Sequence, residues 1–319
     1  MRSLSGASLA LTAVLAFSSV GCAKVGEIKA KKAFKSANQA YQAQDYKKAA
    51  GFYEEAVAAD PNLAQAYFYL GNSYDNLYKP SKKGEPENDA LLTKAVENYQ
   101  KAAEKLSASD DPANKKLGTL SLQYLVASYG PDKLNDPAKA EPVVQRMIQL
   151  EPGEPANYFA LAKIYEDAGA YEEAEKMLQN AKQAKPSDPA VYMTLAGYYN
   201  RQGRFDKTIE ALEERAQKEP NNPEAFYTIA TYYWDEAYRD FKLKENEKNE
   251  FVGKGVEAVD HALQIKPDYT EALVYKNLLL RLQANMEKDP AKQQQLLKEA
   301  DRLRDKAQEL RKQKAAGVS

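Results

Sequence analysis

The spacing of the prolines constrains the fold of this chain more than any other feature of its sequence. Pro152, Pro186 and Pro220 are each 34 residues apart, and Pro267 follows after a longer interval. A fixed period of this length is the signature of a repeat architecture, in which each repeat packs mainly on its neighbours. We therefore expect the 319 residues to form one array of small repeats rather than two globular domains.

The segments between these prolines match one another in side-chain size. We aligned Pro155–Asp188, Pro189–Asn222 and Pro223–Thr270. Column 4 contains Tyr158, Tyr192 and Phe226, and column 7 contains Leu161, Leu195 and Ile229. Column 8 contains Ala162, Ala196 and Ala230, and column 11 contains Tyr165, Tyr199 and Tyr233. Bulky residues at 4, 7 and 11 lie on one face of a helix, and alanine at 8 lets another helix approach. Each segment is therefore predicted to begin with an amphipathic helix.

Turn and cap residues divide each segment into two helices. Gly169 and Gly203 follow the first helix, where glycine adopts the left-handed conformation that ends a helix. Asp188-Pro189 and Asn222-Pro223 place a capping side chain before a proline at the first helical position. The sequence thus predicts an all-α fold of helical hairpins.

This pattern resembles the tetratricopeptide repeat (TPR), whose signature has large residues at positions 4, 7, 11 and 24, small ones at 8, 20 and 27, and proline at 32. The resemblance extends over about seven repeats, near residues 30–63, 64–113, 114–154, 155–188, 189–222, 223–269 and 270–319. It implies a right-handed superhelical solenoid over residues 30–319, with a concave face lined by the first helix of each repeat. The highly charged last helix, Ala291–Lys314, is expected to cap the solenoid.

Three positions depart from the TPR signature near the end of the array. Thr208 and Arg215 replace small residues at positions 20 and 27 of the fifth repeat, and Gly255 occupies position 20 of the sixth. We expect Arg215 to bury its stem while its charge stays in water. The junction after the fifth repeat is therefore predicted to be looser than its neighbours.

Three insertions fall in the turns between the two helices of a repeat. Residues Lys79–Asn88 are rich in proline, glycine and charge, which predicts a surface loop, and Gly130–Asp136 form a shorter loop. Residues Tyr238–Gly253 keep helical propensity and are expected to lengthen both helices into a protruding hairpin. Tolerated surface variation and a docking role are both compatible with these insertions.

The N-terminal residues have the pattern of an export signal. Arg2 precedes an apolar run from Leu9 to Val20, and small residues lead to Cys22. The apolar run has about a dozen residues, whereas a membrane-spanning helix needs ~20. Residues 1–21 are therefore predicted to be a signal peptide rather than a transmembrane anchor.

Residues Ser19-Val20-Gly21-Cys22 resemble the lipobox of bacterial lipoproteins, although Ser19 stands where leucine is usual. The resemblance implies that Cys22 is acylated, that residues 22–29 are a short linker, and that Ala23 directs the lipoprotein to the outer membrane. Several acyl chains would anchor the protein stably. In the alternative, a peptidase of soluble secretion cuts after Ala23 and releases the protein into the periplasm.

The sequence contains few residues suited to catalysis or to metal binding. His261 is the single histidine, which excludes a histidine-based zinc cluster, and it occupies an outward position of a second helix. Gly253-Lys254-Gly255 lacks the upstream glycine and the following serine or threonine of a phosphate loop. No nucleophile with a base is evident. We therefore expect no enzymatic activity, cofactor, metal or small-molecule substrate.

The charge balance argues against a nucleic-acid partner. Lys and Arg total 45 against 46 Asp and Glu, for a net charge of −1. Such a balance provides no long-range attraction to a phosphate backbone. The expected partners are therefore a protein or peptide, and the membrane through the N-terminal lipid.

The TPR resemblance places the candidate binding residues on the first helices. Position 5 carries, in chain order, Phe34, Phe68, Gly118, Phe159, Met193, Tyr227 and Val274. We predict a peptide-binding groove formed by Phe34, Asn38, Phe68, Asn72, Asn76, Phe159, Lys163, Met193, Asn200, Tyr227 and Trp234. Aromatic anchors would supply most of the affinity. In the alternative, the position-5 side chains only pack against neighbouring helices.

Three functional hypotheses follow from these patterns. The first is an outer-membrane lipoprotein that faces the periplasm and acts as an adaptor for envelope proteins. The second is a soluble periplasmic carrier or chaperone-like binder of exported polypeptides. The third is a cytoplasmic scaffold whose N-terminus is not a signal.

Overall fold

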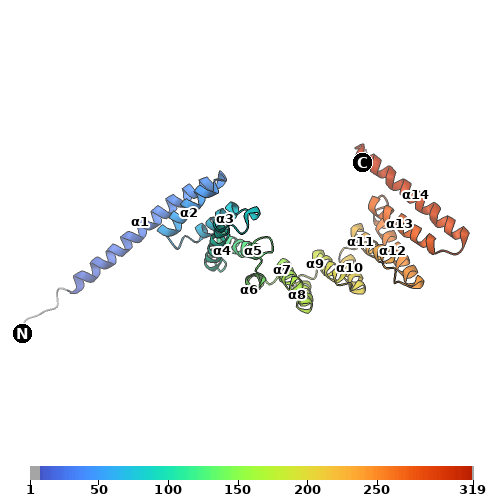
Figure 1. Ribbon diagram of the computed structural model, residues 1–319, viewed down its shortest axis with the longest axis horizontal. Coiled ribbons are helices and arrows are strands. Elements are labelled where there is room, and N and C mark those ends of the chain that lie inside the picture. The colour runs from blue at the N-terminus through green and yellow to red at the C-terminus, as the bar shows by residue number, and fades with distance from the viewer. Residues whose placement is uncertain (1–7, 318–319) are drawn as a thin grey trace, which may run out of the picture. The chain divides into compact units, whose positions relative to one another are not determined.

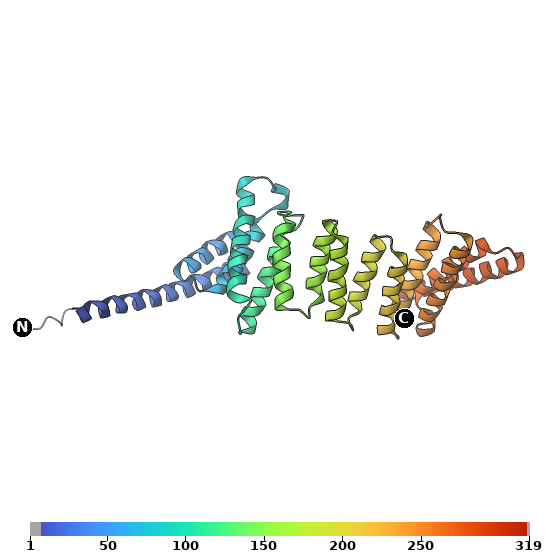
Figure 2. The ribbon, with the colours of Figure 1, turned by 90° about the horizontal axis from the view of Figure 1, so that it is seen from below.

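The computed structural model describes the backbone of residues 8–317 and the side chains of residues 24–317. All side chains of the predicted signal peptide, residues 1–21, and the side chain of Cys22 therefore lie outside the described side chains. Fourteen α-helices and one short 3-10 helix make up the described part of the chain (Figures 1 and 2). Consecutive helices form hairpins, so the predicted all-α repeat fold is confirmed. The helices divide into two compact units, Met1–Gly169 and Ala170–Ser319, which we describe separately.

The N-terminal unit contains α1 to α7 and the short helix η1. The bounds are α1 (Ser8–Gln42), α2 (Tyr46–Ala59), α3 (Ala64–Leu77), η1 (Pro80–Lys82), α4 (Pro86–Leu106), α5 (Pro112–Tyr129), α6 (Pro137–Leu150) and α7 (Pro155–Asp167). Prolines start α4 to α7, and the side chains of Asp111 and Asp136 cap α5 and α6. The insertion at Lys79–Asn88 is partly helical, because η1 and the first turn of α4 lie within it.

Helix α1 differs from the expectation for the N-terminus. It begins at Ser8 and passes without a break through residues 22–29, where a linker was predicted. No proline interrupts residues 8–42, and a glycine inside a helix costs only about 1 kcal/mol relative to alanine. None of the helices in the described residues is both long and apolar enough to cross a membrane.

The core of the N-terminal unit is rich in alanine and tyrosine. Tyr53 on α2 stacks on Tyr69 with ring centroids 5.8 Å apart, and Tyr99 on α4 stacks on Tyr124 at 5.2 Å. The alanines at the predicted small positions are fully buried, among them Ala49 and Ala95. Small residues therefore let the helices approach while tyrosines fill the space between them.

The C-terminal unit contains α8 to α14. The bounds are α8 (Tyr171–Ala184), α9 (Pro189–Arg201), α10 (Phe205–Lys218), α11 (Pro223–Arg239), α12 (Glu245–Ile265), α13 (Thr270–Met286) and α14 (Pro290–Ala315). Helices α11 and α12 have 17 and 21 residues, so the third insertion does lengthen both helices of its hairpin. Gly203 has φ of +67° after α9, as predicted for a glycine that ends a helix.

Arg215 does not keep its charge in water, contrary to the prediction. Its side chain is only 8 % exposed, and Nε lies 2.8 Å from a carboxylate oxygen of Glu219. A second carboxylate, that of Glu224 on α11, lies 3.3 Å from Nη2. The guanidinium is buried because these two partners compensate its charge. Gly255 lets α12 approach α13 closely, since a Cβ atom there would lie 2.8 Å from Cδ2 of Leu279 and would displace that side chain.

The last helix is largely polar on its outer side. Only Ala300, Leu303 and Ala307 of α14 are buried, and they pack on α13 through Leu273 and Leu280. This arrangement agrees with the predicted capping helix.

Candidate functional site

A cavity of about 390 Å³ lies on the side of the N-terminal unit that is formed by the first helices of its repeats, among them α1, α3 and α5. We call this the first-helix side. We call the cavity the tyrosine pocket, and its lining consists of Tyr41, Tyr46, Asn72, Asp75, Asn76, Tyr78, Pro80, Tyr124 and Lys133. Helices α1, α2, α3 and α5 supply six of these residues, and the segments after α3 and α5 supply the others. Two of the three predicted insertions, Lys79–Asn88 and Gly130–Asp136, therefore border the same cavity.

Asn72 is the centre of a hydrogen-bond network below the tyrosine pocket. The Tyr41 hydroxyl donates to Oδ1 of Asn72 at 2.5 Å, and Nδ2 of Asn72 donates to the Tyr99 hydroxyl at 3.3 Å. Asn76 donates from Nδ2 to the backbone oxygen and to Oδ1 of Asn72, both at 2.8 Å. Asn72 is buried and its amide oxygen already accepts two bonds, whereas Asn76 is exposed and its amide oxygen accepts no bond from a described residue. Asn76 is therefore the amide available to a partner.

An ion pair fixes the second insertion over the pocket. The ammonium of Lys133 donates to a carboxylate oxygen of Asp75 on α3, and both side chains are mostly buried. The Tyr78 hydroxyl is fully buried and has no hydrogen-bond partner among the described residues. Burial raises the pKa of Tyr78, so this hydroxyl stays protonated and can donate. A buried hydroxyl without a partner is unusual in a native protein.

The other predicted groove residues of the N-terminal unit have unequal surroundings. Phe68 is only 6 % exposed and contacts the rings of Tyr99 and Tyr124 at 6.2 and 5.9 Å, so it is a core residue. Phe34 is half-buried against Tyr53 at 5.7 Å. Asn38 accepts a bond from the Tyr53 hydroxyl at 2.6 Å. These three side chains therefore pack against neighbouring helices and are not free to form the wall of a groove.

Phe159 and Lys163 lie on α7 and do not line the tyrosine pocket. Phe159 is partly exposed, and Lys163 is exposed and pairs with Asp167 one turn further along the same helix. Their role in binding stays a prediction.

In the C-terminal unit, two predicted anchors belong to one aromatic cluster. We define the cluster as Tyr227, Trp234, Tyr238, Tyr269 and Tyr275. The indole of Trp234 stacks on Tyr238 at 5.0 Å and meets the edge of Tyr275 at 5.6 Å, while Tyr227 packs on Tyr269 and on Tyr275, both at 5.3 Å. Tyr238 is 63 % exposed. The cluster therefore offers ring faces to solvent beside the lengthened α11–α12 hairpin.

The two remaining predicted residues of this unit stand apart from the cluster. The sulfur of Met193 accepts a contact from Nη1 of Arg215 at 2.9 Å, so Met193 serves the packing of α9 on α10. Asn200 is exposed near the end of α9.

Position-based reasoning missed several of the residues that shape these surfaces. Tyr41, Tyr46 and Tyr124 of the tyrosine pocket, together with Lys133, are absent from the predicted groove. Lys133 comes from an insertion, as does Phe241, which is 90 % exposed in the turn between α11 and α12. The insertions in the sequence could have pointed to Lys133 and Phe241, because loops on a rigid scaffold often carry binding residues.

No group of three His, Cys, Asp or Glu side chains in residues 24–317 is close enough together to hold a metal ion. His261 is exposed on α12, as predicted, and its ring lies 3.8 Å from that of Phe226.

Two family models match the chain, and both describe the tetratricopeptide repeat. One covers residues 133–197 and the other residues 189–231. Together they cover residues 133–231, so this stretch of the chain contains tetratricopeptide repeats, which bind protein or peptide partners as scaffolds. No curated relative matches in sequence.

Solved structures of TPR proteins resemble this fold. The C-terminal part of a TPR repeat-containing protein from Cytophaga hutchinsonii is 16 % identical with a TM-score of 0.53, and the match covers 87 % of this chain and 98 % of that one. MamA is 17 % identical with a TM-score of 0.45, over 68 % of this chain and 98 % of its own. YrrB, described as a TPR protein with an unusual peptide-binding site, is 18 % identical with a TM-score of 0.39, over 61 % and 89 %.

Proposed function

We propose that this protein is a membrane-anchored periplasmic scaffold that holds envelope proteins or peptides on its first-helix side. The observation that carries the binding proposal is the tyrosine pocket, with its unpartnered Tyr78 hydroxyl and the free amide oxygen of Asn76. The aromatic cluster of the C-terminal unit is the second contact surface.

The chemistry of the tyrosine pocket suits a polypeptide backbone. The exposed Asn76 oxygen can accept from a peptide N–H, and the buried Tyr78 hydroxyl can donate to a carbonyl once the side chains that cover it move aside. The rings of Tyr41, Tyr46 and Tyr124 provide apolar contact for the side chains of the same segment. Aromatic anchors with a few polar groups are typical of sites where a short segment supplies most of the affinity.

The proposed anchor is the acylated Cys22, and its support is the lipobox resemblance of Ser19–Cys22. Because α1 continues from this region into the first hairpin, an acylated Cys22 would hold the N-terminal unit near the membrane without a long flexible tether. The alternatives are the soluble periplasmic carrier and the cytoplasmic scaffold.

A cross-linked pull-down from intact cells tests the binding proposal. We expect Phe159→Ala combined with Trp234→Ala to reduce the recovery of partners through the predicted groove, and Tyr78→Phe with Asn76→Ala to reduce it through the tyrosine pocket. Tyr171→Ala is the matched control, since Tyr171 is an exposed aromatic at the start of the second helix α8. If every partner survives both double substitutions, the first-helix side is not the binding surface.

Fractionation of cells separates the three locations. The lipoprotein proposal predicts that wild type is recovered with the membrane and that Cys22→Ala becomes soluble. The soluble carrier predicts the same soluble fraction for both proteins. A mature N-terminus that still begins at Met1 in mass spectrometry would favour the cytoplasmic scaffold and contradict export.

A further inference from the structure

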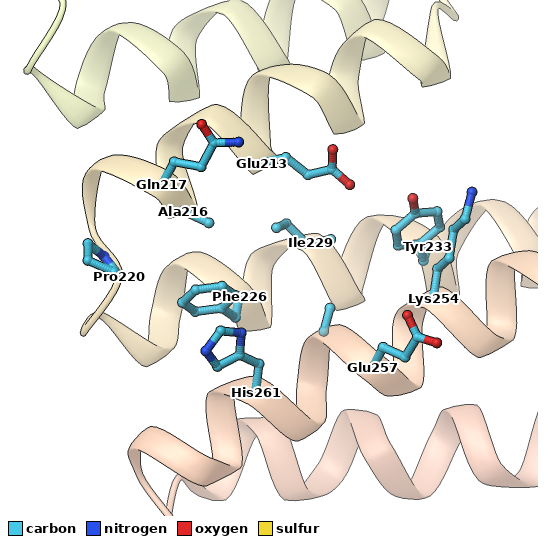
Figure 3. Close-up of a pocket in the computed structure, with 11 residues that line it drawn as sticks. Glu213, Ala216, Gln217, Pro220, Phe226, Ile229, Tyr233, Lys254, Glu257 and His261 are labelled. Atoms are coloured by element: carbon cyan, nitrogen blue, oxygen red, sulfur yellow. The ribbon is translucent and has the colours of Figure 1, made fainter.

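A second cavity, of about 590 Å³, opens between the second helices α10 and α12 of the C-terminal unit (Figure 3). Its floor is apolar and consists of Ala216, Phe226, Ile229 and Ala258. Glu213 extends from α10, and Glu257 from α12, toward one end of this cleft. We call it the α10–α12 cleft. None of the residues predicted for the groove lines it.

The polar end of the α10–α12 cleft is not satisfied by the chain itself. The ring of Tyr233 is buried, and its hydroxyl opens to the cleft, where it forms no hydrogen bond with a described residue. Figure 3 shows this hydroxyl at the same end as the carboxylates of Glu213 and Glu257. Neither carboxylate forms an ion pair with a described residue. The nearby ammonium of Lys254 is taken by Glu250, at 2.7 Å.

The preceding cleft of the same unit, between α8 and α10, is closed by the chain's own cations. Lys182 pairs with Glu214 across the cleft at 2.5 Å, and its ammonium lies 5.5 Å from the ring centre of Tyr192. At the other end, Glu175 on α8 binds both Arg204 and Lys207. The two cations lie over the ring of Tyr199, at 4.9 and 5.2 Å, and the Tyr199 hydroxyl donates to Glu175 at 3.0 Å.

The 34-residue period shows which substitutions open the next cleft. Tyr192 and Tyr199 correspond to Phe226 and Tyr233, so the aromatic floor is kept. Lys182 corresponds to Ala216, and Glu214 corresponds to His261 at the same position of the following second helix, so the first bridge is absent. Glu175 corresponds to Ile209, which removes the carboxylate of the second bridge. No ion pair joins α10 to α12 in the described residues.

We infer that the α10–α12 cleft docks a segment of a partner polypeptide that presents a lysine or arginine beside an apolar side chain. The cation would lie between Glu213 and Glu257, while the apolar side chain would cover Phe226 and Ile229. Charge complementarity supports this occupant, because the cleft is lined by the carboxylates of Glu213 and Glu257 and by one ammonium, that of Lys254, which pairs with Glu250. In the preceding cleft, Arg204 and Lys207 pair with Glu175 over the ring of Tyr199, so a cleft between two second helices can hold a cation in this way.

The test measures binding of two labelled peptides to the full chain by fluorescence anisotropy. One peptide has an arginine flanked by leucines, and the other has glutamine in place of the arginine. We expect the arginine peptide to bind at least 10-fold more tightly. Glu213→Gln with Glu257→Gln should abolish this preference, whereas Glu172→Gln with Glu173→Gln, two exposed carboxylates of α8 outside the cleft, should preserve it.

A second variant closes the α10–α12 cleft with the ion pair that closes the preceding cleft. Ala216→Lys with His261→Glu rebuilds the Lys182–Glu214 bridge one repeat later, and we expect it to abolish binding of the arginine peptide. If this variant does not fold, as judged by circular dichroism, the Glu213 and Glu257 substitutions still decide the question. Equal binding of both peptides, or a preference unchanged by the Glu213 and Glu257 substitutions, would overturn the inference. So would dimerisation of the peptide-free wild type that the closing variant abolishes, because a second copy would then be the occupant.

Discussion

At Gly118 the structure explains why a glycine interrupts the bulky residues of position 5. A Cβ atom on Gly118 would lie 2.4 Å from the backbone nitrogen of Ser107 and 2.5 Å from its Cα. These are backbone atoms at the end of α4, so they cannot move aside as a flexible side chain could. The position therefore serves the approach of α5 to α4 rather than the wall of a groove.

We predict that Gly118→Ala destabilises the N-terminal unit by about 1–3 kcal/mol, the usual cost of an overpacked core. Gly51→Ala is the matched control on the exposed side of α2, where a Cβ meets nothing within 4 Å. This control should stabilise by about 0.5–1 kcal/mol, because alanine is the better helix former. Urea unfolding of the two variants measures both effects. Equal midpoints for the two variants would contradict the close approach of α5 to α4.

Between helices, ion pairs decide which clefts are closed. Glu175 on α8 is the centre of the bridge to α10, and the hydrogen bond from Arg204 is the main cause that lowers its pKa to about 2. Lys207 and Tyr199 also donate to this carboxylate. The bridge therefore contributes to stability only while Glu175 is ionised.

Glu175→Gln should therefore destabilise the C-terminal unit at pH 7 by about 1 kcal/mol, since the carboxylate is partly exposed and solvent screens it. The folded pKa lies below the unfolded value of 4.5, so the contribution is complete well above pH 4.5 and is lost as the pH falls toward 2. Denaturant unfolding of wild type and variant at several pH values checks this. A difference in stability that stays constant from pH 7 to pH 2.5 would show that the charge of Glu175 does not hold the bridge.

The limits of the helices could be predicted from the sequence, whereas the residues that line the tyrosine pocket could not, and the physical reasons differ. Helix limits follow from local signals, such as the Asp188-Pro189 cap before α9 and Gly203 after it, and these signals depend on few neighbours. The tyrosine pocket depends on contacts between residues distant in the chain, such as Lys133 with Asp75. A position number within one repeat contains no information about such contacts, so Phe68 was assigned to a groove although it lies in the core.

At the scale of the whole molecule, many of the 22 tyrosines are buried in the cores of the two units, among them Tyr53, Tyr99 and Tyr199. Burial raises the pKa of Tyr53 and Tyr99 in the N-terminal unit, and raises the pKa of Tyr199 and Tyr227 in the C-terminal unit to about 12. The folded state therefore favours neutral hydroxyls in both units. Stability should depend on alkaline pH more than in a core of leucine and valine.

We expect stability to be unaffected by these groups below pH 10, the unfolded pKa, and to fall as the pH rises from 10 through 12. Tyr227→Phe removes one ionisable group from the aromatic cluster and keeps its ring. This variant should lose less stability than wild type between pH 9 and pH 11.5, as measured by denaturant unfolding. Identical losses would show that the Tyr227 hydroxyl is as accessible in the folded state as in the unfolded one.

The most direct test of the scaffold proposal is site-specific photo-crosslinking in intact cells. A photoreactive amino acid is placed at Asn76, at the tyrosine pocket, or at Glu97, on the exposed side of α4. We predict a discrete protein adduct at position 76 that disappears when Tyr124→Ala is added, and none at position 97. Adducts of equal yield at both positions, or an adduct at position 76 that Tyr124→Ala leaves unchanged, would contradict binding in the tyrosine pocket.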